Sequence, residues 1–240
     1  MTREIGALKI YDTPADVAHA LAQTVVDEAA QAIAQHGRFA ISLAGGTTPK
    51  AAYILLAQAF SSAIDWTKAE IFFGDERCVP PDHDQSNFKT ANDAFLRALA
   101  IPVERIHRMR GEDEPASAAA AYREELIDTL GPIPRFDLVM LGMGPDGHTA
   151  SLFPGIDPLT DNDELVRSVY SESQKQWRIT LTPAVLNASR AVVFAAEGSG
   201  KAQTLKDVRE GPYQPSKYPS QIIAPTSGSL TWLVDRAAAG

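Results

Sequence analysis

Short apolar runs that alternate with amphipathic stretches constrain the fold of this 240-residue chain more than any other feature. Residues 38–43, 70–74, 136–141 and 191–196 carry apolar side chains on both faces of an extended strand. Strands of this kind belong to parallel sheets that helices cover on both sides. We therefore predict a single α/β domain over residues 1–240, with a mostly parallel, Rossmann-like sheet and helices on both faces.

The boundaries of the first helix are predicted from capping signals. Thr13 followed by Pro14 is typical of an N-cap residue with proline in the first turn, and Asp16 suits the same turn. Gly37 is expected to end this helix, and Thr48 to cap the helix at residues 49–60. Further strands are expected at residues 8–11, 105–109, 177–181 and 230–234, and further helices at residues 86–99, 115–130 and 201–209, with a short one from residue 183.

Composition limits the class of partner. The chain is 45% hydrophobic and 22% charged, which is ordinary for a soluble globular protein. A net charge of −8 without any cluster of Lys and Arg argues against nucleic acid and anionic membranes. No apolar run approaches the length of a membrane span, and residues 1–11 lack the apolar segment of a secretory signal, so neither is expected. Cys78 is the single cysteine of the chain, which excludes an internal disulfide and a thiolate zinc site. It is expected to be a buried, inert thiol. The lack of disulfides fits a cytoplasmic protein.

Four loops with unusual residues leave predicted strand ends, at residues 44–49, 74–77, 142–155 and 197–201. Ligands of open α/β sheets bind outside the carboxyl ends of the strands. These loops are therefore expected to converge on one site.

The first of these loops has the chemistry of a phosphate site. Gly45 and Gly46 let backbone N–H groups approach a ligand, the next helix adds its N-terminus, and Thr47 adds a hydroxyl. A plain tight turn is an equally good interpretation of this loop alone. Lys201 at a helix start opposes the helix dipole unless an anion offsets it, and Arg178 is a further candidate cation.

The loop at residues 142–155 begins with a formal G-x-G-x-x-G sequence. Only six residues separate Gly147 from Pro154, which leaves no room for the helix of a dinucleotide site, so NAD is not expected. His148 is expected to face a cleft, because it lies in a glycine-rich loop at a strand end. An imidazole group in that position suits proton transfer near neutral pH. Asp146 can orient that ring or bind a substrate hydroxyl. A loop-stabilising Asp beside an ordinary surface His is the alternative.

Asp75 and Arg77 place both signs of charge at the end of another buried strand. A metal site formed by Asp75 with Asp82, His83 and Asp84 lacks a known ligand spacing. We interpret the charges at residues 82–84 as solvated loop residues. No metal and no cofactor are expected.

The segments at residues 42–49, 73–77, 86–88, 141–154, 178–182 and 200–201 together resemble the 6-phosphogluconolactonase family, in the family's order. The resemblance implies the fold shared with glucosamine-6-phosphate deaminases and ribose-5-phosphate isomerases. The deaminases carry a Glu where this chain has Phe153, and usually Asp-Glu-Tyr where it has Asp75, Glu76 and Arg77. Both departures favour the lactonases.

The resemblance implies hydrolysis of 6-phospho-D-glucono-1,5-lactone to 6-phospho-D-gluconate, the second step of the oxidative pentose phosphate pathway. His148 would act as general base on the attacking water, with Arg77 or loop N–H groups stabilising the oxyanion. Asp75 and Asp146 would contact sugar hydroxyls or orient His148. The phosphate would bind to Gly45, Gly46, Thr47, Arg178 and Lys201.

Two alternatives remain open beside the lactonase. The first is an amino-sugar-phosphate deaminase or isomerase on the same fold. The second is a sugar-phosphate sensor, a class of module usually joined to a DNA-binding segment, of which this sequence shows no sign. In all three, the partner is a small molecule.

Overall fold

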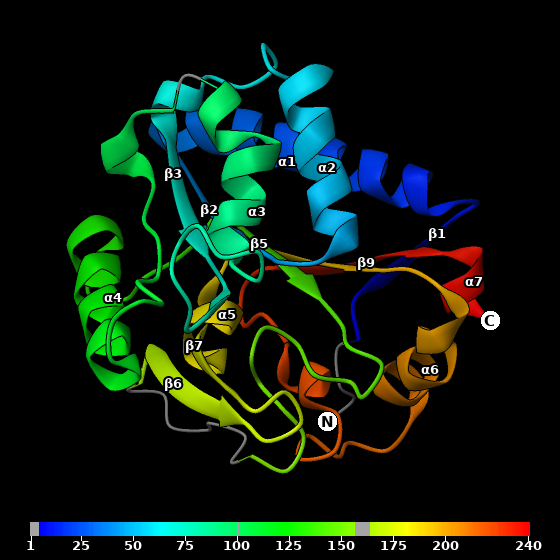
Figure 1. Ribbon diagram of the computed structural model, residues 1–240. Helices are drawn as coiled ribbons and strands as arrows, with labels where there is room; N and C mark the ends of the chain where they lie inside the picture. The colour runs from blue at the N-terminus through cyan, green and yellow to red at the C-terminus, as the bar shows by residue number, and fades with distance from the viewer. Residues whose placement is uncertain (1–4, 100, 157–163) are drawn as a thin grey trace.

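The computed structural model describes residues 5–99, 101–156 and 164–240. Six strands form a parallel sheet in the order β1-β9-β8-β5-β2-β3 (Figure 1). In that order they span Ala7–Tyr11, Ser229–Asp235, Ala191–Ala196, Leu138–Gly142, Phe39–Leu43 and Ala69–Phe73. Every residue of β2 and β8 is buried, which explains why their sequences are continuously apolar. The predicted parallel α/β sheet is confirmed.

Helices cover both faces of the sheet. The buried side chains of α1, α2 and α3 pack on one face, and those of α4, α5, α6 and α7 pack on the other (Figure 1). The helices span Pro14–His36, Thr47–Gln58, Asn87–Ala94, Pro115–Leu130, Pro183–Ala188, Ala202–Glu210 and Arg236–Ala239 for α1 to α7. The 3₁₀ turns η1 to η5 span Trp66–Lys68, Leu96–Ala98, Val103–Arg105, Ser199–Lys201 and Pro219–Ile222.

The predicted capping of α1 is confirmed. Thr13 Oγ1 accepts from the Asp16 backbone N–H at 3.2 Å, and the Asp16 carboxylate accepts from the Thr13 N–H at 3.1 Å. Gly37 ends the helix at a φ of +80°. The prediction of a Thr48 cap on α2 was wrong. That helix begins at Thr47, without a side-chain cap, because Gly46 at a φ of +108° turns the chain into it.

A second, antiparallel sheet in the order β4-β7-β6 lies beside the first, and the sequence did not predict it. Its strands span Asp75–Arg77, Gln176–Leu181 and Val166–Ser171. The strand expected at residues 177–181 exists, but it belongs to this sheet.

Two further predictions need correction. Residues 105–109 do not form a strand, because the chain touches the edge of β3 only at Ile106 and His107 before it turns away. The helix expected at residues 86–99 is interrupted at Phe95, whose φ of −154° is not helical, so α3 ends at Ala94.

The order of the strands creates a switch point at the carboxyl ends of β2 and β5. From β2 the chain continues through α2 to β3, whereas from β5 it continues to β8 on the opposite side of the sheet. Neighbouring strands whose connections diverge in this way leave a crevice between them, and ligands of α/β sheets bind in such crevices.

Candidate active site

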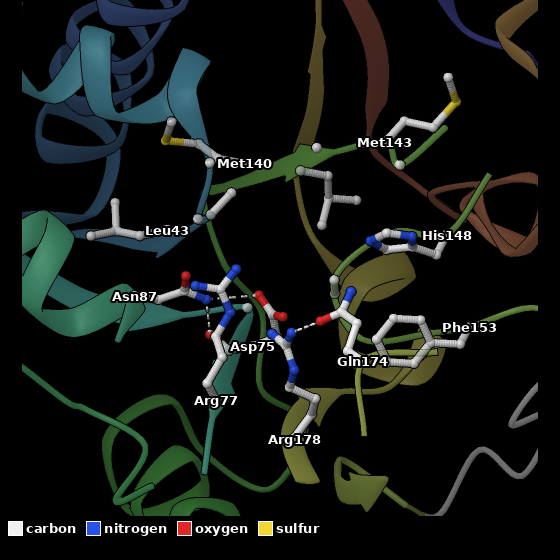
Figure 2. A pocket seen from close by; sticks show the side chains of 18 of the residues that line it. Leu43, Asp75, Arg77, Asn87, Met140, Met143, His148, Phe153, Gln174 and Arg178 are labelled. Atoms are coloured by element: carbon white, nitrogen blue, oxygen red, sulfur yellow. Dashed lines mark hydrogen bonds between the residues drawn. The ribbon is translucent and has the colours of Figure 1, made fainter. Parts of the chain in front are cut away.

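A cavity of about 200 Å³ lies at this switch point. It is lined by the ends of β2 and β5, by β4 and β7 of the second sheet, and by the loop that follows β5 (Figure 2). Its polar side chains belong to Asp75, Arg77, Asn87, His148, Gln174, Arg178 and Lys201. The predicted convergence of strand-end loops is confirmed, because all four loops contribute lining residues.

The glycine loop after β2 presents backbone to the cavity. Gly45 and Gly46 line it, and Gly46 leads directly into the first turn of α2. The first N–H groups of a helix have no partners within the helix, so they face an incoming anion together with the positive end of the dipole. The Thr47 side chain lies outside the lining, and its hydroxyl donates to Glu197 Oε1 at 2.8 Å.

Asp75 lies at the start of β4, where both of its carboxylate oxygens are held. Oδ2 accepts from Ser151 Oγ at 2.7 Å, and Oδ1 accepts from Asn87 Nδ2 at 3.2 Å. The donors come from the loop after β5 and from α3, so Asp75 joins segments that are distant in the sequence. Asp75 is 9% exposed and lines the cavity.

Glu76 does not line the cavity, and it secures α3 to β4. Its carboxylate accepts from the backbone N–H groups of Asn87 and Phe88 at 2.7 and 2.8 Å, and from Ser86 Oγ at 2.9 Å. Burial raises the pKa of Glu76 even though these donors act in the opposite direction. A shift of helix α3 would therefore cost this buried carboxylate the donors at Ser86, Asn87 and Phe88 and leave it the Arg77 backbone N–H at 2.8 Å.

Arg77 and Arg178 occupy opposed positions on β4 and β7. Arg77 Nη1 donates to the Gln85 carbonyl at 2.6 Å, and Arg178 Nη2 donates to Gln174 Oε1. Within the described residues, Nε of each arginine is buried without a hydrogen-bond partner. Burial lowers the pKa of Arg178, the Asp75 carboxylate opposes this, and the neighbouring Arg77 charge adds to it. Paired cations in a cavity, with donors to spare, suit an anionic ligand.

His148 is oriented by Asp146. The two side chains are joined by a 2.5 Å contact between Nδ1 and Asp146 Oδ1. Partial burial raises the pKa of Asp146, but the hydrogen bond and charge of His148 lower it by more. Gly144 gives the ring its room, since a Cβ at this position would lie 2.2 Å from Nδ1. Figure 2 shows the other ring nitrogen directed toward the middle of the cavity. Asp146 does not line the cavity and reaches it only through His148.

Lys201 supplies a cation on the β8 side of the cavity. Burial lowers the pKa of its ammonium group, and the carboxylates of Glu197 and Asp235 oppose that shift. In the part of the chain that the structure describes, no carboxylate lies within salt-bridge distance of its Nζ.

Metal and thiol chemistry find no support in the described residues. No group of three or more His, Cys, Asp or Glu side chains among them is arranged to hold a metal ion. Asp84 is almost fully exposed, and His83 Nδ1 accepts from the Gln85 backbone N–H at 3.1 Å. Cys78 is half-buried rather than fully buried, and burial raises its pKa to about 11, so it remains a protonated thiol at neutral pH.

The sequence did not single out Gln174 and Ser151. Gln174 reaches the cavity from the turn between β6 and β7, and β6 was not predicted. Ser151 lies in the same loop as His148, but the residue to which it donates its hydrogen bond, Asp75, is 76 residues away in the sequence. No local pattern reports such a contact.

Comparison with known proteins assigns the family. Residues 12–232 match the family described as glucosamine-6-phosphate isomerases/6-phosphogluconolactonase. The chain belongs to this family. A family member from Synechocystis sp., named 6-phosphogluconolactonase, is 39% identical over 213 residues, which are 87% of this chain and 86% of that protein.

Solved structures agree with the family assignment. The 6-phosphogluconolactonase from Trypanosoma cruzi superposes with a TM-score of 0.89 at 27% identity, covering 100% of this chain and 97% of that one. A monomeric glucosamine-6-phosphate deaminase superposes with a TM-score of 0.82 at 20% identity, covering 97% of this chain and 98% of that one. The likeness to the deaminase shows the fold alone. Among the residues that the structure describes, no helix is long and apolar enough to cross a membrane.

Proposed function

We propose that this chain, as one lactonase domain over residues 1–240, hydrolyses 6-phospho-D-glucono-1,5-lactone to 6-phospho-D-gluconate. The observation that carries the proposal is the Asp146–His148 pair, whose free ring nitrogen faces a cavity that also holds Arg77 and Arg178. A proton-transfer group beside paired cations suits an ester that carries a phosphate. The names of the family members that resemble this chain support the same reaction.

The chemistry begins with water at His148. Nε2 removes a proton from the water as its oxygen forms a bond to C1 of the lactone, and the imidazolium is stabilised by Asp146. The Arg77 guanidinium or loop N–H groups stabilise the oxyanion. The tetrahedral intermediate then collapses, the bond between C1 and the ring oxygen breaks, and His148 returns the proton to that oxygen. General acid–base catalysis of this kind contributes about 10²- to 10⁴-fold in rate.

The phosphate group is assigned to the glycine loop and to two of the cations that line the cavity. The backbone N–H groups at Gly45, Gly46 and Thr47 meet it at the start of α2, and the Arg178 and Lys201 side chains neutralise its charge. Asp75, fixed by Asn87 and Ser151, accepts from a sugar hydroxyl. The reaction requires no metal to polarise the carbonyl, because a lactone is a reactive ester.

No observation favours the deaminase alternative. The position at which the deaminases carry a Glu is occupied by Phe153, which is 7% exposed and whose ring centroid lies 5.1 Å from that of His148. We propose further that the chain acts in the cytoplasm on this small molecule, without a nucleic-acid partner.

The test is an assay of His148→Ala. The lactone is generated enzymatically from glucose 6-phosphate, and the acceleration of its hydrolysis is followed with and without a chelator. The variant should lose about 10²- to 10⁴-fold in kcat while still binding phosphate, and the wild type should be insensitive to the chelator. His19→Ala, an exposed histidine on α1, is the matched control. A His148→Ala protein with the wild-type rate would sink the mechanism, and ammonia release from glucosamine 6-phosphate would favour the deaminase.

A further inference from the structure

Asn87 is a buried amide that the proposed chemistry does not use directly. It stands in the first turn of α3, is 3% exposed, and lies at the wall of the cavity. Its Nδ2 donates to the Asp75 carbonyl at 2.8 Å and to Asp75 Oδ1 at 3.2 Å, as Figure 2 shows. The donor end of this amide therefore fixes both the backbone and the carboxylate of Asp75.

The acceptor end of the same amide faces the glycine loop. Asn87 Oδ1 is buried and has no hydrogen-bond partner among the described residues. A Cβ at Gly45 would lie 2.1 Å from Oδ1 and 2.7 Å from Cγ. The amide thus rests directly against the Cα of Gly45, where any other residue would collide with it.

Gly45 is required by this contact and not by its backbone conformation. Its φ is not positive, unlike that of the adjacent Gly46, so an L-residue could adopt the same backbone. The steric limit comes from Asn87, because the three atoms nearest to a Cβ here all belong to that side chain.

Asn87 has little freedom to retreat. Its own backbone N–H donates to the buried Glu76 carboxylate at 2.7 Å, as that of Phe88 does at 2.8 Å. Ser86 Oγ donates to the same carboxylate. The start of α3 is therefore secured to β4, and the amide is a rigid spacer between β4 and the glycine loop.

We propose that Asn87 is a positioning residue that sets the separation between the glycine loop and Asp75, and through it the distance at which the two ends of the substrate are held. This inference rests on the proposed function, in which the loop binds the phosphate and Asp75 binds the sugar. The amide does not touch the reacting atoms. It acts through its steric contact with Gly45 and through its two hydrogen bonds to Asp75.

The test is a double-mutant cycle of Gly45→Ala and Asn87→Ala. Gly45→Ala should displace the loop and raise KM at least 10-fold with a much smaller change in kcat. Asn87→Ala should lower kcat by about 10-fold, since Asp75 loses its amide donor. In the double variant the methyl group has room, so KM should return to within about threefold of the Asn87→Ala value while kcat stays low. Asn87→Ser replaces Asn87→Ala if the latter fails to fold.

A second readout requires no turnover and separates this inference from the proposed function. Inorganic phosphate should raise the Tm of the wild type, raise that of Gly45→Ala by much less, and again raise that of the double variant. Thr90→Ala on the same helix, which removes only a bond to the Ser86 carbonyl, should match the wild type in both assays.

The outcomes that overturn the proposal are specific. If Gly45→Ala keeps the wild-type KM and phosphate response, or if the double variant is as impaired as Gly45→Ala, Asn87 does not set the position of the loop. If the wild type hydrolyses no lactone, the proposed function fails, and the phosphate response of the three variants still decides whether Asn87 positions the loop.

Discussion

Asp146 Oδ1 accepts two hydrogen bonds from His148, one from Nδ1 at 2.5 Å and one from the backbone N–H at 3.2 Å. The pKa of Asp146 is lowered because the hydrogen bond and charge of His148 outweigh partial burial, so this carboxylate is ionised at neutral pH. An ionised carboxylate only accepts hydrogen bonds, so Nδ1 carries the proton and Nε2 is left as the base.

Substitution of Asp146 should therefore lower kcat with little effect on KM. Asp146→Asn retains an acceptor but loses the charge that stabilises the imidazolium, and Asp146→Ala loses both. A hydrogen bond to a charged group contributes roughly 1.5–3 kcal/mol. We therefore expect kcat to fall about 10-fold in Asp146→Asn and about 100-fold in Asp146→Ala. Steady-state kinetics on the lactone measure this order. The exposed Asp65→Asn serves as control, and an Asp146→Ala enzyme with unchanged kcat would remove Asp146 from the mechanism.

The opposed Arg77 and Arg178 should require an anion for full stability. Arg178→Gln removes one of the two opposed guanidinium groups, so it should raise KM by about 10- to 100-fold. It should also reduce the rise in Tm that inorganic phosphate causes, since a ligand that binds only the folded state stabilises it in proportion to its affinity. Differential scanning fluorimetry across a phosphate titration measures the second effect.

Arg97→Gln on the exposed surface is the matched control for Arg178→Gln. An Arg178→Gln protein whose Tm responds to phosphate as the wild type does would place the phosphate elsewhere.

The part of the fold that follows local rules could be predicted from the sequence. The continuous apolar runs of β2 and β8 indicate strands buried on both faces, and Thr13 with Asp16 indicates the start of α1. The location of the site followed from topology, since the carboxyl ends of parallel strands meet at one edge. His148 was found because it lies in such a loop.

The remaining features depend on contacts between distant residues. Strand β4 has three charged residues and resembles a loop, and it becomes a strand only because Asp75 pairs with Thr180 and Arg77 with Arg178. The same pairing places the two arginines side by side. The role of Asn87 depends on α3 and the glycine loop meeting in space, which no spacing along the chain reveals.

Phe153 should be required for its apolar character. Its ring is 7% exposed and packs against His148. Phe153→Leu should keep kcat within a few fold, because a large apolar side chain still supports the imidazole. Phe153→Glu would bury a carboxylate, so it should lower Tm and reduce kcat more than 10-fold without gain of ammonia release.

The loss of Tm in Phe153→Glu should shrink as the pH falls, because protonation removes the buried charge. Thermal melts at pH 5 and pH 8 test this point. Equal losses at the two pH values would mean that the carboxylate escapes to solvent.

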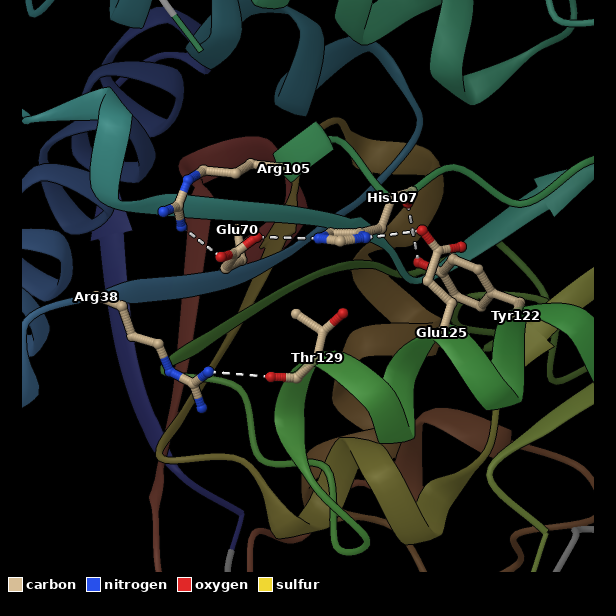
Figure 3. Close-up of polar contacts among 7 residues, drawn as sticks. All are labelled: Arg38, Glu70, Arg105, His107, Tyr122, Glu125 and Thr129. Carbon is tan, nitrogen blue, oxygen red and sulfur yellow. Dashed lines mark hydrogen bonds and ion pairs between the residues drawn. The ribbon is translucent and has the colours of Figure 1, made fainter. Parts of the chain in front are cut away.

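A separate cluster on the far side of β3 should make stability depend on pH. Figure 3 shows His107 between two carboxylates, with Nε2 3.0 Å from Glu70 and Nδ1 2.8 Å from Glu125, while Arg105 pairs with Glu70. Burial alone would lower the pKa of His107, but the two carboxylates more than offset it and the pKa is raised. The Tyr122 hydroxyl donates to the His107 carbonyl and ties the cluster to α4.

A histidine whose folded pKa is raised contributes its full stability below its unfolded pKa, about 6.5, and loses that contribution as the pH rises through the folded value. A difference of one unit between the folded and unfolded pKa changes the free energy of unfolding by about 1.4 kcal/mol. For a domain of this size, each kcal/mol changes Tm by about 2–4 °C. The wild type should therefore lose Tm between pH 6.5 and 9 relative to His107→Gln, whose neutral amide does not titrate. Arg38, which immediately precedes β2, donates to the Thr129 carbonyl on the same helix. Arg38→Gln removes this bond and should lower Tm equally at every pH. If His107→Gln and the wild type differ by the same amount at pH 6 and pH 9, His107 is not protonated between its two carboxylates, and the neutral ring contributes its packing on Phe72 and one donated hydrogen bond.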